Sequence, residues 1–303
     1  GGCYNRREPQ RNVRGGSNMT ITKTRLEIGL EKPFRALHMS DNHIALADNR
    51  DDERKIKLAE SRTAAFNHGK PGNVAMEEYA LQLDYARSHR LPVLYTGDLC
   101  DFVSYKNLDY ARDTLKDIDY FMAVGNHEFS LYVGEAFEDL PYKRKSFDLV
   151  QSYFRNDLHF ASRVMGGVNF VALDNGYYRF DADQLARMKR EIEKGLPIVL
   201  MMHNPLHTQQ LYDEMMTNRK QPCAYLTGTP DALMTGYDEY RLRQQQADAD
   251  TMAFIDYIYA QPLIRAVLAG HLHFNYETRL PSGIMQYVTG GGYCGDTREI
   301  EFV

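Results

Sequence analysis

PVLYTGDLCD, residues 92–101, is an apolar run of strand composition that ends in a glycine and two aspartates. Four other segments share this design, in which a short apolar run is followed at once by side chains that can bind metals. They are RALHMSDNH (35–43), YFMAVGNHE (120–128), PIVLMMHNP (197–205) and IRAVLAGHLH (264–273). Short apolar runs of this kind predict buried strands. The five segments therefore predict five strands with polar, potentially functional ends.

Helical patterns and further strands lie between and beyond these segments. We predict helices at Asp51–Phe66, Ala75–His89, Tyr105–Lys116, Asp181–Lys194 and Thr251–Ala260. Further strands are predicted at Thr20–Leu30, Val168–Leu173, Glu277–Arg279, Ile284–Val288 and Glu299–Val303, the last three as short antiparallel strands. This alternation predicts an α/β protein in which helices cover a sheet core. No repeat of 20–50 residues is present, which argues against a solenoid or a propeller.

The composition suits one large globular domain. The chain has 303 residues, 43% hydrophobic and 25% charged, enough to build a rigid core without disulfides. Residues 1–18 hold four arginines and four glycines but almost no apolar residues, so we expect a flexible tail before a domain at 19–303. The tyrosine-rich insert at 206–250 is a candidate lid or substrate wall, with a helical surface excursion as the alternative.

Charge and cysteine content limit the partners. The net charge is -5, so no whole-chain basic field attracts nucleic acid, although a locally basic groove stays open. No apolar stretch approaches 18 residues, so we expect no membrane span. The four cysteines are far apart and form no CxxC pair, which argues against a thiolate zinc site. We expect a cytoplasmic protein; a removed signal peptide would leave no trace, so that alternative stays open.

The polar strand ends supply a mixed set of nitrogen and oxygen ligands. In open α/β sheets, ligand sites lie just beyond the carboxyl ends of the strands, so these side chains are expected at one rim of the sheet. Imidazole, carboxylate and amide groups together suit divalent transition metals. Seven such side chains are too many ligands for one ion, but they suit two ions that share a carboxylate. The seven are Asp41, His43, Asp98, Asn126, His203, His271 and His273. Each motif alone is weak evidence for a metal site. Five such motifs, each directly after a predicted strand, are too many to arise by coincidence.

The ordered series DxH, GDxxD, GNHE, a single histidine and GHxH resembles the signature of the calcineurin-like metallophosphoesterase family. The resemblance runs from about Ile28 to Gly292. It implies a four-layer αββα sandwich with two mixed β-sheets and a two-metal site at the loop rim. It also implies that Asp98 bridges two ions. Asp41, His43 and His273 would complete the first site, and Asn126, His203 and His271 the second.

The same resemblance implies a phosphoester hydrolase. Two cations ~3.5–4 Å apart bind phosphate oxygens and lower the pKa of a bridging water, so that a metal-activated hydroxide attacks in line. His127 is implied as the general acid toward the leaving oxygen. Asp101, three residues after Asp98, is implied as the carboxylate that orients His127, with a turn or capping role as the alternative. The ligand set accepts manganese, iron, zinc or nickel.

Two differences from related phosphatases limit the possible substrate and the type of metal site. Protein serine/threonine phosphatases have an arginine where this chain has Phe102, which argues against a phosphoprotein substrate. Purple acid phosphatases have a metal-binding tyrosine at the position of Asp101, so we expect no iron–tyrosinate site. The leading hypothesis is a phosphomonoesterase or phosphodiesterase of a small molecule such as a nucleotide. A nuclease of the same family and a scaffold that has lost catalysis stay open, and the pattern fixes neither metal identity nor oligomeric state.

Overall fold

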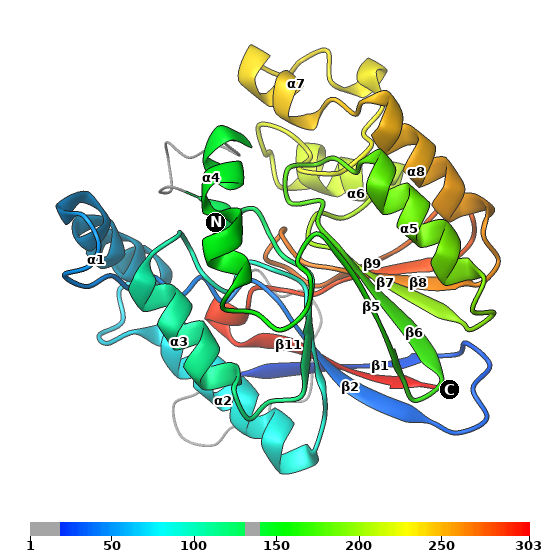
Figure 1. The fold of residues 1–303 in the computed structure, drawn as a ribbon. Helices are drawn as coiled ribbons and strands as arrows, with labels where there is room; N and C mark the ends of the chain where they lie inside the picture. Colours follow the sequence, from blue (N-terminus) through cyan, green and yellow to red (C-terminus); the bar gives the residue numbers. More distant parts are fainter. Residues whose placement is uncertain (1–18, 131–139) are drawn as a thin grey trace.

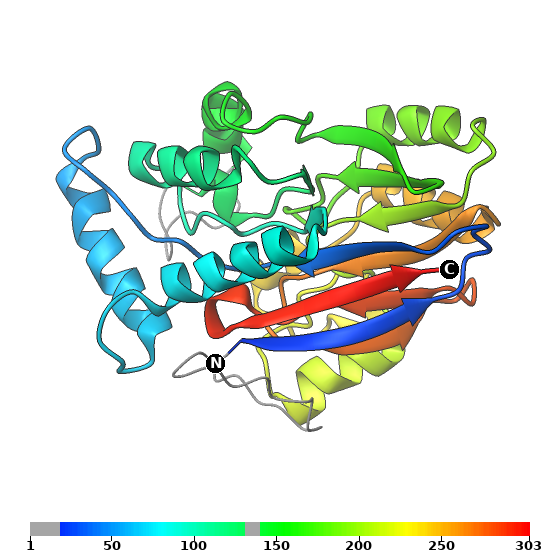
Figure 2. The same cartoon turned by 90° about the horizontal axis from the view of Figure 1, so that it is seen from below.

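The computed structural model describes residues 19–130 and 140–303, so the tail expected at 1–18 lies outside the described residues. Two sheets pack against each other, with helices on both outer faces (Figures 1 and 2). The first sheet contains, in spatial order, β1 (Thr20–Leu26), β11 (Asp296–Phe302), β2 (Phe34–Met39), β3 (Val93–Tyr95) and β4 (Tyr120–Met122). The second contains β5 (Phe160–Met165), β6 (Val168–Leu173), β7 (Ile198–Met201), β8 (Ile264–Ala269), β10 (Met285–Val288) and β9 (Tyr276–Arg279).

Both sheets are mixed. In the first, β2, β3 and β4 run parallel; in the second, β6, β7, β8 and β10 do so. The expectation of short antiparallel strands near the C-terminus is right for β9 and β10, which pair antiparallel. It is incomplete for β11, which crosses to the first sheet and lies parallel to β1 and antiparallel to β2. There Ile300 and Phe302 help to fill the core between the sheets.

Alternation of side chains along the strands builds separate cores on the two faces of each sheet. In β7, Val199 and Met201 point into the core between the sheets. Ile198 and Leu200 point the other way, toward the outer helices. β2 and β3 divide their apolar residues between the inner core and their own helices in the same manner. A strand covered on both faces is apolar at nearly every position, which explains the continuous apolar runs in the sequence.

Helices complete the outer layers. α2 (Val74–His89) and α3 (Tyr105–Leu115) pack on the first sheet, and α5 (Ala182–Ile192) and α8 (Ala249–Ala260) pack on the second. α1 (Glu53–Asn67) lies beyond the strand ends of the first sheet, against α2 and the loops after β2 and β3. Each of these helices begins at a side chain that accepts a backbone N–H three residues later: Asp52, Asn73, Ser104, Asp181 and Asp248. The predicted four-layer αββα sandwich is confirmed.

α4 (Leu140–Gln151), which the sequence pattern did not reveal, supports the functional end of the sandwich. It packs on the short 3₁₀ turn His127–Phe129 that follows β4. The rings of Phe147 and Phe129 stack with centroids 5.4 Å apart. This contact anchors the turn that carries His127.

The insert at 206–250 folds into short elements: α6 (Gln209–Asp213), a π-helical turn (Glu214–Asn218), a 3₁₀ turn (Asp231–Leu233) and α7 (Glu239–Gln245). Its Leu211, Met215, Ala224 and Leu226 form a core with residues that follow β8, namely Leu272, Phe274 and Val288. The insert is therefore packed onto the loop that carries two of the predicted ligands. Neither its helices nor any other helix among the described residues is long and apolar enough to cross a membrane.

Candidate metal centre

The segments that follow five strands meet at one end of the sandwich. The seven predicted ligands follow β2 (Asp41, His43), β3 (Asp98), β4 (Asn126), β7 (His203) and β8 (His271, His273). Three of these strands belong to the first sheet and two to the second. The two sheets are joined here, because the backbone N–H of His271 donates to Oδ2 of Asp41 at 2.9 Å. The structure thus brings all five motifs together.

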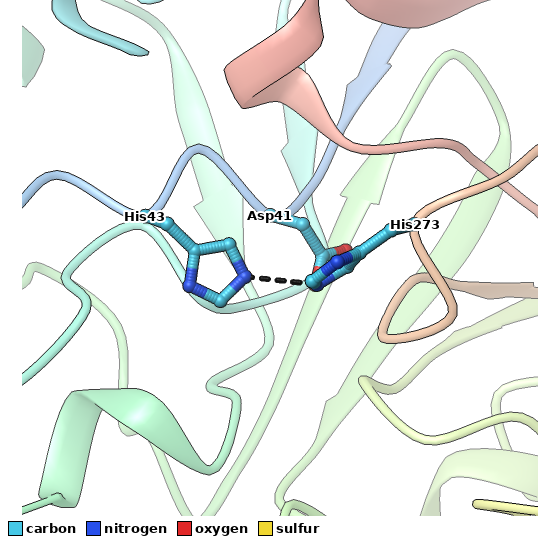
Figure 3. Close-up of side chains that lie close together, drawn as sticks. All are labelled: Asp41, His43 and His273. Carbon is cyan, nitrogen blue, oxygen red and sulfur yellow. Dashed lines mark hydrogen bonds and ion pairs between the residues drawn. The ribbon is translucent and has the colours of Figure 1, made fainter. Parts of the chain in front are cut away.

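Asp41, His43 and His273 form a first group, with one potential ligand atom each within 4.8 Å of one another. Nε2 of His43 lies 3.6 Å from Oδ1 of Asp41 and 3.0 Å from Nε2 of His273. Nε2 of His273 lies 3.3 Å from the same Asp41 oxygen. Figure 3 shows the two imidazoles approaching the carboxylate from different loops.

Asp98, His203 and His271 form a second group. Nε2 of His203 lies 3.0 Å from Oδ2 of Asp98 and 3.1 Å from Nδ1 of His271. The same Asp98 oxygen lies 3.8 Å from Nε2 of His43, which belongs to the first group. Asp98 is therefore placed between the two groups, as a bridging ligand must be.

The backbone of the centre is strained. Of the ten described non-glycine residues with positive φ, five are predicted ligands: Asp41, His43, Asp98, His271 and His273, with φ from 50° to 71°. The left-handed region costs a residue with a Cβ on the order of 1–2 kcal/mol. Strain of this kind persists where the surrounding structure enforces it, and it is concentrated at functional sites. Here these five left-handed residues supply side chains of the two Asp/His groups.

Two buried oxygen atoms of the cluster fit a bound cation. Oδ1 of Asp41 and Oδ1 of Asn126 have no hydrogen-bond partner among the described residues. Leaving a buried polar group unpaired costs about 1–3 kcal/mol, and a metal ion is a partner that removes this cost. Imidazole nitrogens with carboxylate and amide oxygens suit divalent transition metals. The residues present therefore fit a dimetal centre.

The carboxylates create a field that favours positive charge. Burial lowers the pKa of His43, but the neighbouring carboxylates of Asp101 and Asp41 raise it overall to about 10. Burial likewise lowers the pKa of His203, and the charges of Asp98 and Asp41 raise it to about 9. Metal binding must displace such protons, because an imidazole coordinates a metal in its neutral form.

Hydrogen bonds on the far side of the rings orient two of the ligands. Nδ1 of His203 donates to the carbonyl of Thr96 at 2.6 Å, which turns Nε2 toward Asp98. Nε2 of His271 lies 2.7 Å from the hydroxyl of the buried Tyr178, which turns Nδ1 toward His203. Such outer contacts fix the tautomer of a metal-binding histidine. No motif marks Tyr178 in the sequence.

Asp101 holds two histidines in different ways. Its Oδ1 is 2.8 Å from Nδ1 of His43, and its carboxylate also accepts from the guanidinium of Arg62 at 2.7 and 3.1 Å. Nδ1 of His127 donates instead to the backbone carbonyl of Asp101 at 2.7 Å and lies 3.4 Å from the carboxylate. The family resemblance paired this carboxylate with His127; here it bonds His43 and Arg62, while the Asp101 carbonyl accepts from His127. Arg62 lies on α1, and no sequence motif marks it.

Glu128, the last residue of GNHE, is buried and organises two of the motif loops. Its Oε2 accepts from the backbone N–H groups of Asp98 and Gly125 at 2.9 and 2.8 Å. Its Oε1 accepts from those of Leu99 and Cys100 at 2.6 and 3.1 Å. One carboxylate thus satisfies four N–H groups in the loops after β3 and β4. Its part in joining these loops depends on long-range contacts that the GNHE motif does not reveal.

Glycine is required where the motif loops touch. A Cβ on Gly125 would overlap the carboxylate of Asp98, and a Cβ on Gly270 would overlap Ser40 and the carboxylate of Asp41. These close approaches explain why GNHE and GHLH each begin with glycine. The absence of a side chain lets loops from neighbouring strands approach closely enough to share ligands.

Residues 34–275 match the family described as calcineurin-like phosphoesterase, a span that contains all five motifs. The chain belongs to this family. This calcineurin-like phosphoesterase is accordingly a hydrolase. The two Asp/His groups described above, Asp41–His43–His273 and Asp98–His203–His271, are the candidate ligands of the dimetal centre typical of the family. Among curated protein sequences, none matches the chain.

Similar solved structures have low sequence identity to this phosphoesterase. A dimetal phosphatase from Danio rerio is 13% identical, with a TM-score of 0.47 over 88% of this chain and 91% of that one. A putative 5'-nucleotidase from Staphylococcus aureus is 14% identical, with a TM-score of 0.44 over 86% and 49%. The phosphopantetheinyl hydrolase of Mycobacterium tuberculosis is 12% identical, with a TM-score of 0.42 over 89% and 91%.

Proposed function

We propose that this protein hydrolyses the phosphoester bonds of small molecules, phosphomonoesters or phosphodiesters, at a two-metal centre. The observation that supports this is the joining of two ligand groups at Asp98. Asp98 and His127 both line a cavity of about 280 Å³. In this proposal Asp98 belongs to both metal sites. The first is completed by Asp41, His43 and His273, and the second by Asn126, His203 and His271.

When bound, two divalent cations would supply Lewis acidity toward the phosphate oxygens and an activated water as nucleophile. The protein supplies the proton for the leaving group. Because Nδ1 of His127 donates to the carbonyl of Asp101, Nε2 is the ring atom left for a transferable proton. His127 gives this proton to the ester oxygen as the P–O bond breaks, so that the product leaves as a neutral alcohol. Asp101 acts as a positioning residue, through its carbonyl on His127 and its carboxylate on His43.

Two features favour a small molecule over a nucleic acid strand. The net charge is -5, and the described residues that line the cavity include one arginine and no lysine. Nucleic-acid binding needs an extended basic surface. The nuclease alternative predicts binding that weakens steeply with salt. The ligand set does not select among manganese, iron, zinc and nickel, so metal identity belongs to the experiment.

The test is hydrolysis of p-nitrophenyl phosphate and bis-p-nitrophenyl phosphate by chelator-stripped protein to which each of the four metals is returned separately. We expect metal-dependent turnover that Asp98→Asn abolishes. Asp84→Asn, an exposed aspartate on α2, is the matched control and should retain full activity. Bound metal without turnover of either ester would favour the scaffold alternative. Absence of metal binding would refute the proposal.

His127→Ala tests the acid. A neutral leaving group matters most for a poor leaving group, so the variant should lose far more activity toward alkyl phosphates than toward p-nitrophenyl phosphate. Its metal content should equal that of the wild-type protein. Equal losses on both esters would contradict the assignment of His127 as the proton donor.

A further inference from the structure

The cavity above the metal centre has two kinds of wall. The first consists of predicted ligands and His127, together with Leu272 and Phe274 from the loop after β8 and Tyr293 from the turn that precedes β11. The remaining part comes from the insert, whose contributing residues are Met215, Arg219, Gln221 and Tyr225. The insert therefore supplies side chains that a substrate bound at the metals would contact.

Arg219 is the one permanently charged cation among the described residues that line this cavity. Its position is fixed on two sides. Nε donates to Oε1 of Glu214 at 2.9 Å, and the guanidinium lies over the ring of Phe274, 3.4 Å from the centroid. Its Nη groups make no hydrogen bond or ion pair with any described residue. A guanidinium that is held in this way, with its terminal donors uncommitted, is preorganised to bind an anion.

Besides Arg219, the insert contributes Met215, Gln221 and the aromatic ring of Tyr225 to the cavity wall. The ring of Tyr225 lies edge-on to His271, with centroids 5.9 Å apart, and the guanidinium of Arg241 lies 5.2 Å from the Tyr225 ring on the insert side. The ring of Tyr293 also lines the cavity, with its centroid 5.2 Å from that of His273. Aromatic walls bind planar or apolar groups. The volume, about 280 Å³, is at the small end for ligand pockets, which favours a compact substrate.

We propose that Arg219 binds a phosphate oxygen of the substrate, and that the substrate is a compact phosphomonoester with a planar or apolar organic group. This inference rests on the proposed phosphoester hydrolysis. A phosphomonoester dianion carries one more negative charge, and one more unesterified oxygen, than a diester. An arginine that faces the cavity therefore favours the monoester, while the aromatic rings contact its organic part.

The experiment compares Arg219→Gln with Arg243→Gln in the metal-loaded protein. Arg243 is the matched control, because it lies in the same insert and pairs with Glu239 at 3.0 Å but does not line the cavity. We expect Arg219→Gln to lower kcat/KM for p-nitrophenyl phosphate by about 10- to 100-fold, the usual effect of losing a charge-assisted hydrogen bond. The diester should change less than about threefold, and Arg243→Gln should resemble the wild-type protein. An equal loss on both esters, or no loss on either, would overturn the inference.

Binding measurements separate this inference from the proposed function. Inorganic phosphate should bind metal-loaded Arg219→Gln about tenfold or more weakly than the wild-type protein, with unchanged metal content and unfolding midpoint. Phenylphosphonate should bind the wild-type protein more tightly than methylphosphonate does, because its ring contacts the aromatic wall. Unchanged phosphate affinity refutes the role of Arg219, and equal phosphonate affinities refute the preference for a planar group. A wild-type protein without turnover would refute the hydrolase proposal alone, because phosphate binding still tests Arg219.

Discussion

Replacing Glu128 by glutamine should destabilise the fold far more than a change of one atom suggests. The carboxylate accepts four backbone N–H groups, two at each oxygen, from the loops that carry Asp98 and Asn126. A glutamine amide keeps one oxygen and places an NH₂ group against the other two N–H donors. Two hydrogen bonds to a charged acceptor are lost, and each contributes about 1.5–3 kcal/mol. The lost bonds therefore set an upper limit of about 3–6 kcal/mol, and relief of the buried negative charge offsets part of this loss. Typical domains have a total stability of about 5–15 kcal/mol.

The assay is urea unfolding of metal-free protein at pH 8.5. Burial and the charge of Asp98 raise the pKa of Glu128 to about 7, against the effect of the backbone N–H groups, so this pH keeps the carboxylate ionised. Glu60→Gln, at an exposed position on α1, is the control and should change the free energy of unfolding by less than about 0.5 kcal/mol. If Glu128→Gln lost less than about 1 kcal/mol, the four bonds would not be organising these loops, and the reasoning would be refuted.

Three further results are expected. Tyr178→Phe should weaken one of the two metal sites by about 10- to 100-fold, because His271 loses its orienting partner; chelator competition measures this, and an affinity equal to that of Tyr177→Phe would contradict it. Burial, together with the charge of Arg298, lowers the pKa of His38 to about 3. The folded state therefore keeps this imidazole neutral, and stability falls as the pH drops from about 6.5 toward 3. Between pH 7 and 4.5 the cost of His38→Gln, measured by urea unfolding, should shrink by about 3 kcal/mol, and a constant cost would contradict the assignment. Returning manganese to chelator-stripped protein should raise the unfolding free energy by about 2.7 kcal/mol at 100 times the dissociation constant, and a concentration-independent midpoint would argue against specific binding.

Much of the centre could be predicted from the sequence because its signals are local. An apolar run predicts a buried strand, and a glycine followed by Asp, Asn or His at its end predicts a loop that presents a ligand. The five motifs named the seven candidate ligands and His127 without any knowledge of long-range contacts. The α/β class could be predicted as well, because predicted strands and helices alternate along the chain.

The sequence by itself determined which side chains stand at strand ends and that helices cover a sheet core, since both follow from short-range composition and alternation. Tertiary structure alone decided that two sheets share the centre and that β11 joins the first sheet beside β1 and β2. It also decided that the Asp101 carboxylate serves His43 and Arg62, and that Arg219 enters the cavity from the insert. These contacts join residues tens to hundreds of positions apart. They depend on how whole layers pack, and no local pattern encodes that packing.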